Sequence, residues 1–571
     1  MDTQLIHERI LSESYADILA ARELPRQDIQ QEYASFGAQS ITSQFVMLHA
    51  PLSNLPGDLL SVLGYYNIPK LYTTLDITSL ERSGITQVLS LSSLDIQGEQ
   101  VLIGFLDTGI AWQAPAFRNP DGTTRIAGIW DQTIQAEDPA SWFLNYGTVY
   151  TEEQINQALF SSNSLEHLPT EDLDGHGTLL ASIAGGSPDP ASGFTGAAPG
   201  CRLAMVRLKP AKNYLKQFFL VPDTALAFQE TDLLTGISYL QSLAASLRLP
   251  LVLCIGLGTT QGDHAGGSPL NTVLNEAARK AGFFPVAAAG NEAGLGHHFY
   301  GQVSSENTPV TAELLVSEDT LGFSMELWGQ TPERFALSVT SPLGETIPEL
   351  FPRLRQQAVY SFALERTILS INYELAETQS GNQLILLRFF LPTPGIWQIH
   401  VQNTSQINGQ FHIWLPIAGF LPSGTQFLAP DPDTTLTDPG DASGCITAST
   451  YNAYDGSLYI HSSRGYTRTG AIKPDLAAPG VSVTGLRPAS GLQGFRYTTA
   501  SGSSVAAAIT AGSAALLAGW LRTRPNPMTP TAAELKNLLI LGASRSTTLS
   551  YPNRAWGYGA LNLYGIFQNI R

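Results

Sequence analysis

The feature that most constrains the fold is an apolar segment, VLIGFLDTG at residues 101–109, that stops abruptly at Asp107, Thr108 and Gly109. Its large and β-branched residues are typical of a strand buried on both faces, as in a parallel sheet covered by helices. Ligand sites in such open α/β sheets lie at the carboxyl ends of the strands. The segment therefore predicts a carboxylate at a functional edge, although an Asp in this setting also serves as a helix cap or turn residue.

A second segment, DGHGTLLASIAGG at 174–186, predicts a helix whose first turn carries His176. The apolar residues after it recur with helical spacing, so we expect the helix to bury one face against a sheet. Glycine on either side of His176 leaves the imidazole accessible and allows a close approach of other backbone. A neutral imidazole is the general base that a serine nucleophile requires near neutral pH, whereas a lone histidine is otherwise a structural residue.

A third segment, SGSSVAAAITAGSAALL at 501–517, predicts a buried, alanine-rich helix opened by serines. One interpretation of Ser504 is a helix N-cap. The other is a nucleophile, because a hydroxyl at a helix N-terminus lies beside backbone N–H groups that can stabilise an oxyanion. The run FFPVAAAGNE at 283–292 predicts another apolar strand, and its end at Gly290 and Asn291 offers either a second oxyanion donor or a simple turn.

Taken together, these segments resemble those of the subtilase family of serine proteases, in which Asp, His and Ser occur in this chain order. The resemblance implies that Asp107 orients the imidazole and that His176 acts as base and then as acid. It implies further that Ser504 is the nucleophile and that Asn291 stabilises the oxyanion. The implied fold is α/β, a subtilisin-like parallel sheet flanked by helices, and the implied activity is that of a serine endopeptidase.

The segment VLCIGLG resembles the family's strand that lines the substrate cleft. The resemblance implies that Leu257 and Gly258 flank the specificity pocket and pair with the substrate backbone, and that Gly290 also contributes to substrate binding. Two positions depart from the usual family pattern. Gly256 stands where many subtilases have Ser, and Ser503 stands where the residue before the nucleophile is commonly Thr. Neither departure removes a catalytic atom.

Composition excludes several classes of function. With 571 residues, of which 43% are hydrophobic and 14% charged, the chain can bury more than one core and is not disordered. Its net charge of −17 argues against a nucleic-acid partner, which requires clustered Lys and Arg. Cys201, Cys254 and Cys445 show neither disulfide nor zinc spacing, and no calcium-loop pattern occurs, so we expect no metal and no cofactor.

Three regions are expected along the chain. Residues 1–93 predict a small α+β module that resembles the family's prodomain, or otherwise an accessory domain. The catalytic domain is expected at 94–300 and 441–571. Between these parts, alternating apolar and polar residues at 301–440 predict an inserted antiparallel β-sandwich of jelly-roll type. No secretion signal or membrane-spanning stretch occurs in the sequence, which predicts a chain made in the cytoplasm.

This arrangement resembles the Csp germination proteases of clostridial spores, and the tract GNEAGLGHHF at 290–299 strengthens the resemblance. It implies limited proteolysis of the zymogen of a spore-cortex hydrolase, self-cleavage of the prodomain, and a location in the outer layers of the spore. We expect the segment from Ser83 to Gly98 to be extended and to enter the cleft as a strand. The resemblance to the Csp group implies a cut near Gln87 that leaves the prodomain bound. The alternatives are a non-catalytic pseudoprotease in germinant signalling and a broad-specificity intracellular subtilase.

Overall fold

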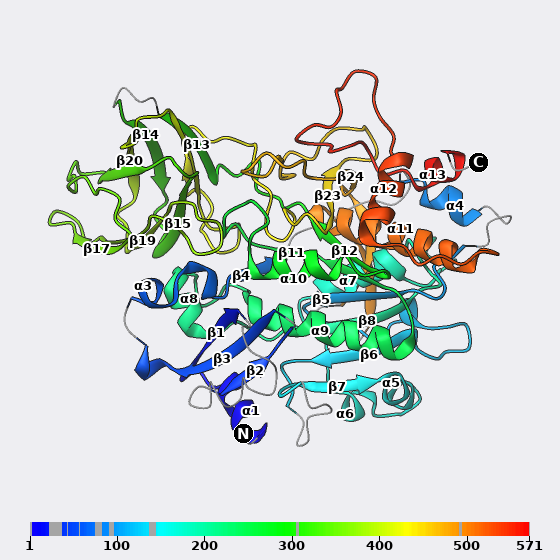
Figure 1. Cartoon of the computed structure of the whole chain (residues 1–571). Helices are drawn as coiled ribbons and strands as arrows, with labels where there is room; N and C mark the ends of the chain where they lie inside the picture. Colours follow the sequence, from blue (N-terminus) through cyan, green and yellow to red (C-terminus); the bar gives the residue numbers. More distant parts are fainter. Residues whose placement is uncertain are drawn as a thin grey trace.

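An eight-stranded, mostly parallel sheet forms the centre of the computed structural model (Figure 1). The structure describes residues 3–21, 37–42, 44–55, 58–74, 83–90, 96–135, 144–303, 308–489 and 494–569. The strand order is β24-β23-β12-β10-β5-β8-β6-β7, and only the edge strand β7 runs antiparallel to its neighbour. The strands are β5 (Leu102–Asp107), β6 (Ile126–Asp131), β7 (Thr148–Thr151), β8 (Arg202–Arg207), β10 (Leu251–Ile255), β12 (Phe283–Ala288), β23 (Ile446–Tyr451) and β24 (Leu476–Pro479).

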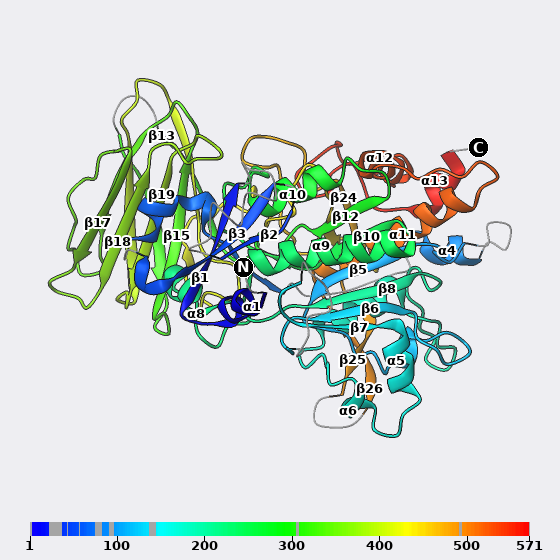
Figure 2. The same ribbon diagram turned by 60° about the horizontal axis from the view of Figure 1, so that its bottom comes forward.

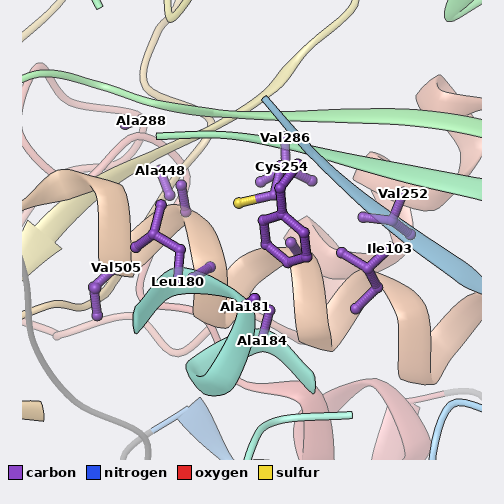
Figure 3. Close-up of a cluster of buried hydrophobic side chains, with 14 of the residues drawn as sticks. Ile103, Leu180, Ala181, Ala184, Val252, Cys254, Val286, Ala288, Ala448 and Val505 are labelled. Atoms are coloured by element: carbon purple, nitrogen blue, oxygen red, sulfur yellow. The ribbon is translucent and has the colours of Figure 1, made fainter. Parts of the chain in front are cut away.

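Helices cover both faces of this sheet, because its strands send alternate side chains into two separate cores. From β5, Ile103 and Phe105 enter one core while Leu102 and Leu106 enter the other. Figure 3 shows the first core, where side chains of α7 and α11 meet those of β5, β10 and β12. The second core lies under α9 and α10. These four helices are α7 (His176–Gly185), α9 (Glu230–Leu247), α10 (Pro269–Ala277) and α11 (Ser503–Thr523).

This architecture confirms the predicted α/β class, a parallel sheet flanked by helices. Among the helices of the described residues, α11 alone is long and apolar enough to cross a membrane, and 94% of its apolar window is buried inside the protein, as in a core helix.

The remaining elements of this part are η4 (Pro115–Phe117), α5 (Glu152–Leu159), α6 (Ser164–His167), α8 (Asn213–Phe219), β9 (Phe228–Gln229), β11 (Leu257–Gly258), β25 (Val483–Pro488), β26 (Phe495–Ala500), α12 (Ala532–Gly542) and α13 (Leu563–Asn569).

The N-terminal module builds its own small sheet, with the strand order β1-β3-β2. A buried polar contact joins it to the catalytic part: Asp17 accepts a hydrogen bond from Lys212 Nζ at 3.0 Å. Although burial raises the pKa of Asp17, Lys212 and a hydrogen bond with His49 hold that pKa well below its usual range. The elements of the module are α1 (Thr3–Leu11), β1 (Tyr15–Ala21), β2 (Ala38–Ser40), β3 (Phe45–Pro51), η1 (Leu52–Asn54), α3 (Leu59–Leu63), η2 (Tyr65–Asn67), β4 (Leu71–Thr74) and α4 (Ile85–Ser90).

The prediction of an extended segment from Ser83 to Gly98 is wrong for α4, which is helical and contacts α13. Ile85 and Val88 are buried on one side of α4, while Gln87 faces solvent. Apolar residues three positions apart share a helix face, whereas a strand would have placed them on opposite faces. Gln87, the predicted neighbourhood of the cleavage site, therefore lies on a short surface helix and not on a strand.

Residues 298–427 form two antiparallel sheets that pack on one shared core, at the end of the molecule away from the C-terminus (Figure 2). The strand orders are β13-β21-β15-β19-β18-β17 and β16-β20-β14-β22. The sheets start and end somewhat before the predicted bounds of 301 and 440. Their strands are β13 (His298–Val303), β14 (Val310–Val316), β15 (Gly322–Gly329), β16 (Phe335–Thr340), β17 (Arg355–Ser361), β18 (Ile368–Glu374), β19 (Leu384–Phe390), β20 (Gly395–Asn403), β21 (Gly409–Trp414) and β22 (Gln426–Phe427).

A buried junction joins this β-domain to both other parts of the chain. Glu326 of β15 accepts hydrogen bonds from the hydroxyl of Tyr65 in the N-terminal module and, at 3.1 Å, from the backbone N–H of Gly262 in the catalytic part. The indole N–H of Trp328 donates to the same carboxylate at 3.0 Å. Burial raises the pKa of Glu326. Glu326 therefore connects the three parts of the chain through hydrogen bonds at one buried position.

Candidate active site

The carboxylate at the end of β5 meets the histidine at the start of α7. His176 Nδ1 lies 2.8 Å from Asp107 Oδ1 and 3.0 Å from Asp107 Oδ2. The carboxylate is 1% exposed and also accepts the backbone N–H of Thr108 at 2.8 Å. Such an anchored carboxylate selects the tautomer with a proton on Nδ1, so Nε2 is the basic nitrogen of the ring.

Ser504 lies in the first turn of α11, where its Oγ is 3.3 Å from Nε2 of His176. This separation allows the hydroxyl proton to pass to the imidazole, the activation that a serine nucleophile needs. Glycine allows α7 to approach the residues that follow β5, because a Cβ on Gly177 would lie 2.2 Å from the carbonyl oxygen of Gly109. The structure thus brings together the three residues that the sequence singled out.

Asn291 lies beside the N-terminus of α11, just after β12. Its Oδ1 accepts the backbone N–H of Ser503 at 3.0 Å. The hydroxyl of Ser503 in turn accepts the backbone N–H of Gly290 at 3.1 Å. Because its oxygen accepts the N–H of Ser503, the NH₂ group is the part of the Asn291 side chain that can act as a donor to an oxyanion. The departure at Ser503 from the usual Thr therefore keeps a hydroxyl that holds this corner of the site.

Sequence reasoning missed Asp172, a 3% exposed carboxylate behind the histidine. It accepts the hydroxyl of Thr108 at 2.8 Å, the backbone N–H of Gly175 at 2.9 Å and both the N–H and hydroxyl of Thr178, at 2.8 and 2.6 Å. These bonds tie the end of β5 to the first turn of α7. Asp172 is therefore a positioning residue for His176. The only feature of the sequence that could have indicated this role is its place four residues before His176.

Gly256 lies at the point where the predicted cleft strand passes the catalytic residues. A Cβ at this position would lie 2.4 Å from Leu180 Cδ1, 3.1 Å from Ser504 Cβ and 3.3 Å from His176 Cε1. Leu180 is fully buried in the core beneath the site, so it has little room to withdraw (Figure 3). The space that a serine side chain would occupy here is thus taken by Leu180.

We expect Gly256→Ser to lower kcat/KM about tenfold or more and to destabilise the fold by about 1–3 kcal/mol, because the added atoms overpack the contact with Leu180 and displace His176 or Ser504. Steady-state kinetics on a peptide substrate and thermal melting provide the two measurements. The double variant Gly256→Ser/Leu180→Ala should recover activity relative to Gly256→Ser. If Gly256→Ser had the kcat/KM of the wild-type protein, the contact of residue 256 with Leu180 would not restrict the side chain at this position.

A strand of the N-terminal module lies in the predicted substrate cleft. Strand β4 pairs antiparallel with β9 on one side and with β11 on the other, forming a three-stranded sheet. Thr73 is opposite Gly258 and Thr74 is opposite Leu257. Leu257 and Gly258 therefore pair with an extended backbone, in the way that was expected for a substrate. Gly290, the third predicted substrate-binding residue, precedes Asn291 and donates its backbone N–H to the Ser503 hydroxyl.

No cation site accompanies these residues in the described part of the chain. No group of three or more His, Cys, Asp or Glu side chains there is placed to hold a metal ion. Cys201, Cys254 and Cys445 are all buried and form no disulfide. Burial raises the pKa of Cys201 to about 11 and that of Cys445 to about 12, so these thiols stay protonated near neutral pH and are poor nucleophiles.

The fold and the Asp–His–Ser geometry are those of the subtilisin type. The chain belongs to the subtilase family, whose sequence model matches residues 98–312 and 427–559. The interruption between the two matched segments falls within the antiparallel β-domain, which lies outside the common family core.

Among solved structures, the CspB protease of Clostridium perfringens is similar to this chain, with 29% sequence identity and a TM-score of 0.74 over 85% of this chain and 96% of that one. This similarity confirms the resemblance to the Csp group. Among curated proteins, subtilisin-like protease SBT3.6 of Arabidopsis thaliana is 33% identical over 115 residues, which are 18% of this chain and 14% of that protein. Serine protease AprX of Bacillus subtilis (strain 168) is 36% identical over 147 residues, 23% of this chain and 31% of that protein. The matches thus span less than two thirds of these curated relatives.

Proposed function

We propose that the protein is an endopeptidase in which Asp107, His176, Ser504 and Asn291 carry out acyl transfer. The observation that carries this proposal is the continuous series of contacts from the Asp107 carboxylate through the imidazole to Ser504 Oγ, at the carboxyl end of the central sheet. The antiparallel pairing of β4 in the same cleft supports a peptide substrate. A pseudoprotease would have no need to retain all of these groups.

In the proposed reaction, Ser504 Oγ attacks the carbonyl carbon of the scissile bond while His176 Nε2 takes its proton. The resulting oxyanion accepts hydrogen bonds from the NH₂ group of Asn291 and from the backbone N–H of Ser504. Collapse of this intermediate breaks the C–N bond, and the imidazolium gives its proton to the leaving amine. Water, deprotonated by His176, then hydrolyses the acyl ester and restores the hydroxyl. Asp107 stabilises the imidazolium in both steps.

We also propose that the chain cleaves itself, and that the bond cut is Leu75–Asp76. The support is the register of β4: Thr73 and Thr74 are opposite Gly258 and Leu257, and the next residue of the cleft strand, Gly256, adjoins Ser504. From this register we infer a cut after the residue that follows Thr74; Leu75 and Asp76 lie outside the described residues. This proposal replaces the predicted cut near Gln87.

Mass spectrometry of the incubated wild-type protein should give a new N-terminus at Asp76, while the two fragments migrate together on size exclusion. Ser504→Ala should remain a single chain. Leu75→Pro should also slow processing by at least tenfold, because a proline at the proposed acyl position has no N–H to donate and a restricted backbone. Gln87→Ala is the matched control and should be processed normally. A new N-terminus at residue 88 instead would restore the first assignment.

We propose further that the natural substrate is the zymogen of a spore-cortex hydrolase, cut by limited proteolysis during germination in the outer layers of the spore. The similarity to the Clostridium perfringens CspB protease supports this assignment. The net charge of −17 suits a neutral or cationic protein substrate. Incubation with such a zymogen should produce one cleavage near its N-terminus, and Ser504→Ala should produce none. Degradation at many sites would favour a broad-specificity protease.

A further inference from the structure

The N-terminal module covers part of one sheet of the β-domain. Helix α3 of this module contacts β17, the edge strand beside β18 (Figure 1). Asn372 of β18 donates a hydrogen bond from Nδ2 to Oδ1 of Asp58, the N-cap residue of α3, at 2.9 Å. Arg355 of β17 donates to the backbone carbonyl of Ser61 at 3.4 Å. Strands β17 and β18 thus form a docking surface for this end of the module.

Glu374 lies on this docking surface. It is two residues after Asn372, so the two side chains are on the same face of β18. Glu374 is 2% exposed, and neither of its oxygens has a hydrogen-bond partner among the described residues. Glu326 of the same sheet, in contrast, accepts three hydrogen bonds. A buried carboxylate without a donor is strongly unfavourable, whereas the neutral carboxylic acid is much easier to bury.

Charged groups from three parts of the chain face Glu374. Arg355 is opposite it on β17, Glu377 follows β18, and Lys70 belongs to the N-terminal module. Burial raises the pKa of Glu374 to about 7; Arg355 opposes this rise, Glu377 adds to it, and the backbone of Tyr65 and Lys70 oppose it. Lys70 Nζ donates to the backbone carbonyl of Tyr65 at 2.9 Å and so is held within its own module.

We propose that Glu374 makes the docking of the N-terminal module on the β-domain dependent on pH, with the protonated carboxyl group favouring the docked state. When the group ionises, the docked module keeps an anion away from water, and detachment of α3 restores its hydration. Because β4 of the same module pairs with the cleft strand β11, detachment also favours an open cleft. This consequence for the cleft rests on the endopeptidase function proposed above, whereas the pH-dependent contact does not.

The pKa of Glu374 in the two states determines the direction of the effect. It is about 7 in the docked state and returns to its usual value of 4.5 once water reaches the carboxyl group. The docked state therefore binds the proton more tightly, so docking is favoured at acidic pH and weakens as the pH rises from 4.5 to 7. The equilibrium constant for opening should increase roughly 40-fold between pH 5 and pH 7 and level off above this range.

Amide hydrogen exchange in the uncleaved Ser504→Ala chain measures this opening. After division by the intrinsic exchange rates at each pH, exchange of residues 59–67 should increase roughly 40-fold between pH 5 and pH 7, while exchange in β12 should not change. Glu374→Gln in this chain keeps the size of the side chain but cannot ionise, so the increase should fall below about threefold. Glu318→Gln, at an exposed position of the same domain, is the matched control and should behave like the parent chain. An equal increase in all three proteins, or none in the parent chain, would overturn the proposal.

A second variant tests the same titration without replacing Glu374. Glu377→Gln removes the neighbouring negative charge that raises the pKa of Glu374. The opening should therefore reach its plateau at a lower pH in this variant than in the parent chain. An unchanged pH profile would contradict the assignment of the titrating group to Glu374.

The consequence for the cleft is measured by the rate at which a fluorophosphonate labels the processed protein. At pH 8 the wild-type protein should be labelled at least about tenfold faster than Glu374→Gln, and at pH 5 the two rates should differ by less than about fivefold. Equal rates at pH 8 would overturn the link between this contact and the cleft. Absence of labelling in both proteins, together with pH-dependent exchange, would contradict the proposed endopeptidase and leave the pH-dependent contact supported.

Discussion

Replacing Ser504 with Ala is expected to lower the turnover of a peptide substrate by about 10⁶-fold and to leave the fold intact. The hydroxyl is the only group removed, and the N-cap of α11 is Gly502, where no side chain makes a capping hydrogen bond, so the substitution removes no helix cap. What is lost is the nucleophile that lies 3.3 Å from His176 Nε2. The rate, measured with active-site-titrated enzyme, and the melting temperature together separate chemistry from folding.

A fluorophosphonate probe supplies the control for this result. It should label Ser504 of the wild-type protein once its cleft is open, and it should label neither Ser504→Ala nor His176→Ala. His176→Ala should lose a similar factor in turnover, since groups that act as a unit are not additive. Near wild-type turnover by either variant would refute the assigned nucleophile and base. Absence of labelling in the wild-type protein would instead favour a signalling pseudoprotease.

Replacing Asn291 with Ala is expected to reduce kcat on the order of 10²- to 10³-fold with a small change in KM. The amide acts only on the charge that develops in the transition state, and the backbone N–H of Ser504 remains as the other donor. Single-turnover kinetics isolate this chemical step. The expected loss is smaller than for Ser504→Ala because one donor, and not the nucleophile, is removed.

Asn291 also accepts the backbone N–H of Ser503 at 3.0 Å, so the control must separate catalysis from local structure. Asn291→Asp keeps an oxygen acceptor for Ser503 but lacks the NH₂ donor. It should therefore be about as slow as Asn291→Ala while preserving the wild-type melting temperature. If Asn291→Asp turned over at the wild-type rate, the side chain would have no role in stabilising the oxyanion.

The sequence by itself was sufficient to predict the class of fold and the side chains that the structure brings together at one site. Asp107 and Asn291 each follow an apolar run, and His176 and Ser504 each open a helix, so local chain chemistry marks all four. In a parallel sheet, the ends of strands and the starts of the following helices meet at one edge. Their proximity in the structure follows from that rule, even though His176 and Ser504 are 328 positions apart.

Only the tertiary structure decided which segment lies in the cleft and what it contacts there. The sequence predicts an extended linker at residues 85–90, whereas the structure has a helix there. Strand β4 has no sequence feature that distinguishes it from other short strands, and its place in the cleft is defined by its pairing with β9 and β11. Tyr72 and Asp438, 366 positions apart, show no shared local pattern that could predict their hydrogen bond. Every residue except proline carries the same backbone N–H donor and C=O acceptor, so the sequence does not show which strands will pair. Which backbone groups at a strand edge are left without a partner is known only once the sheet has formed.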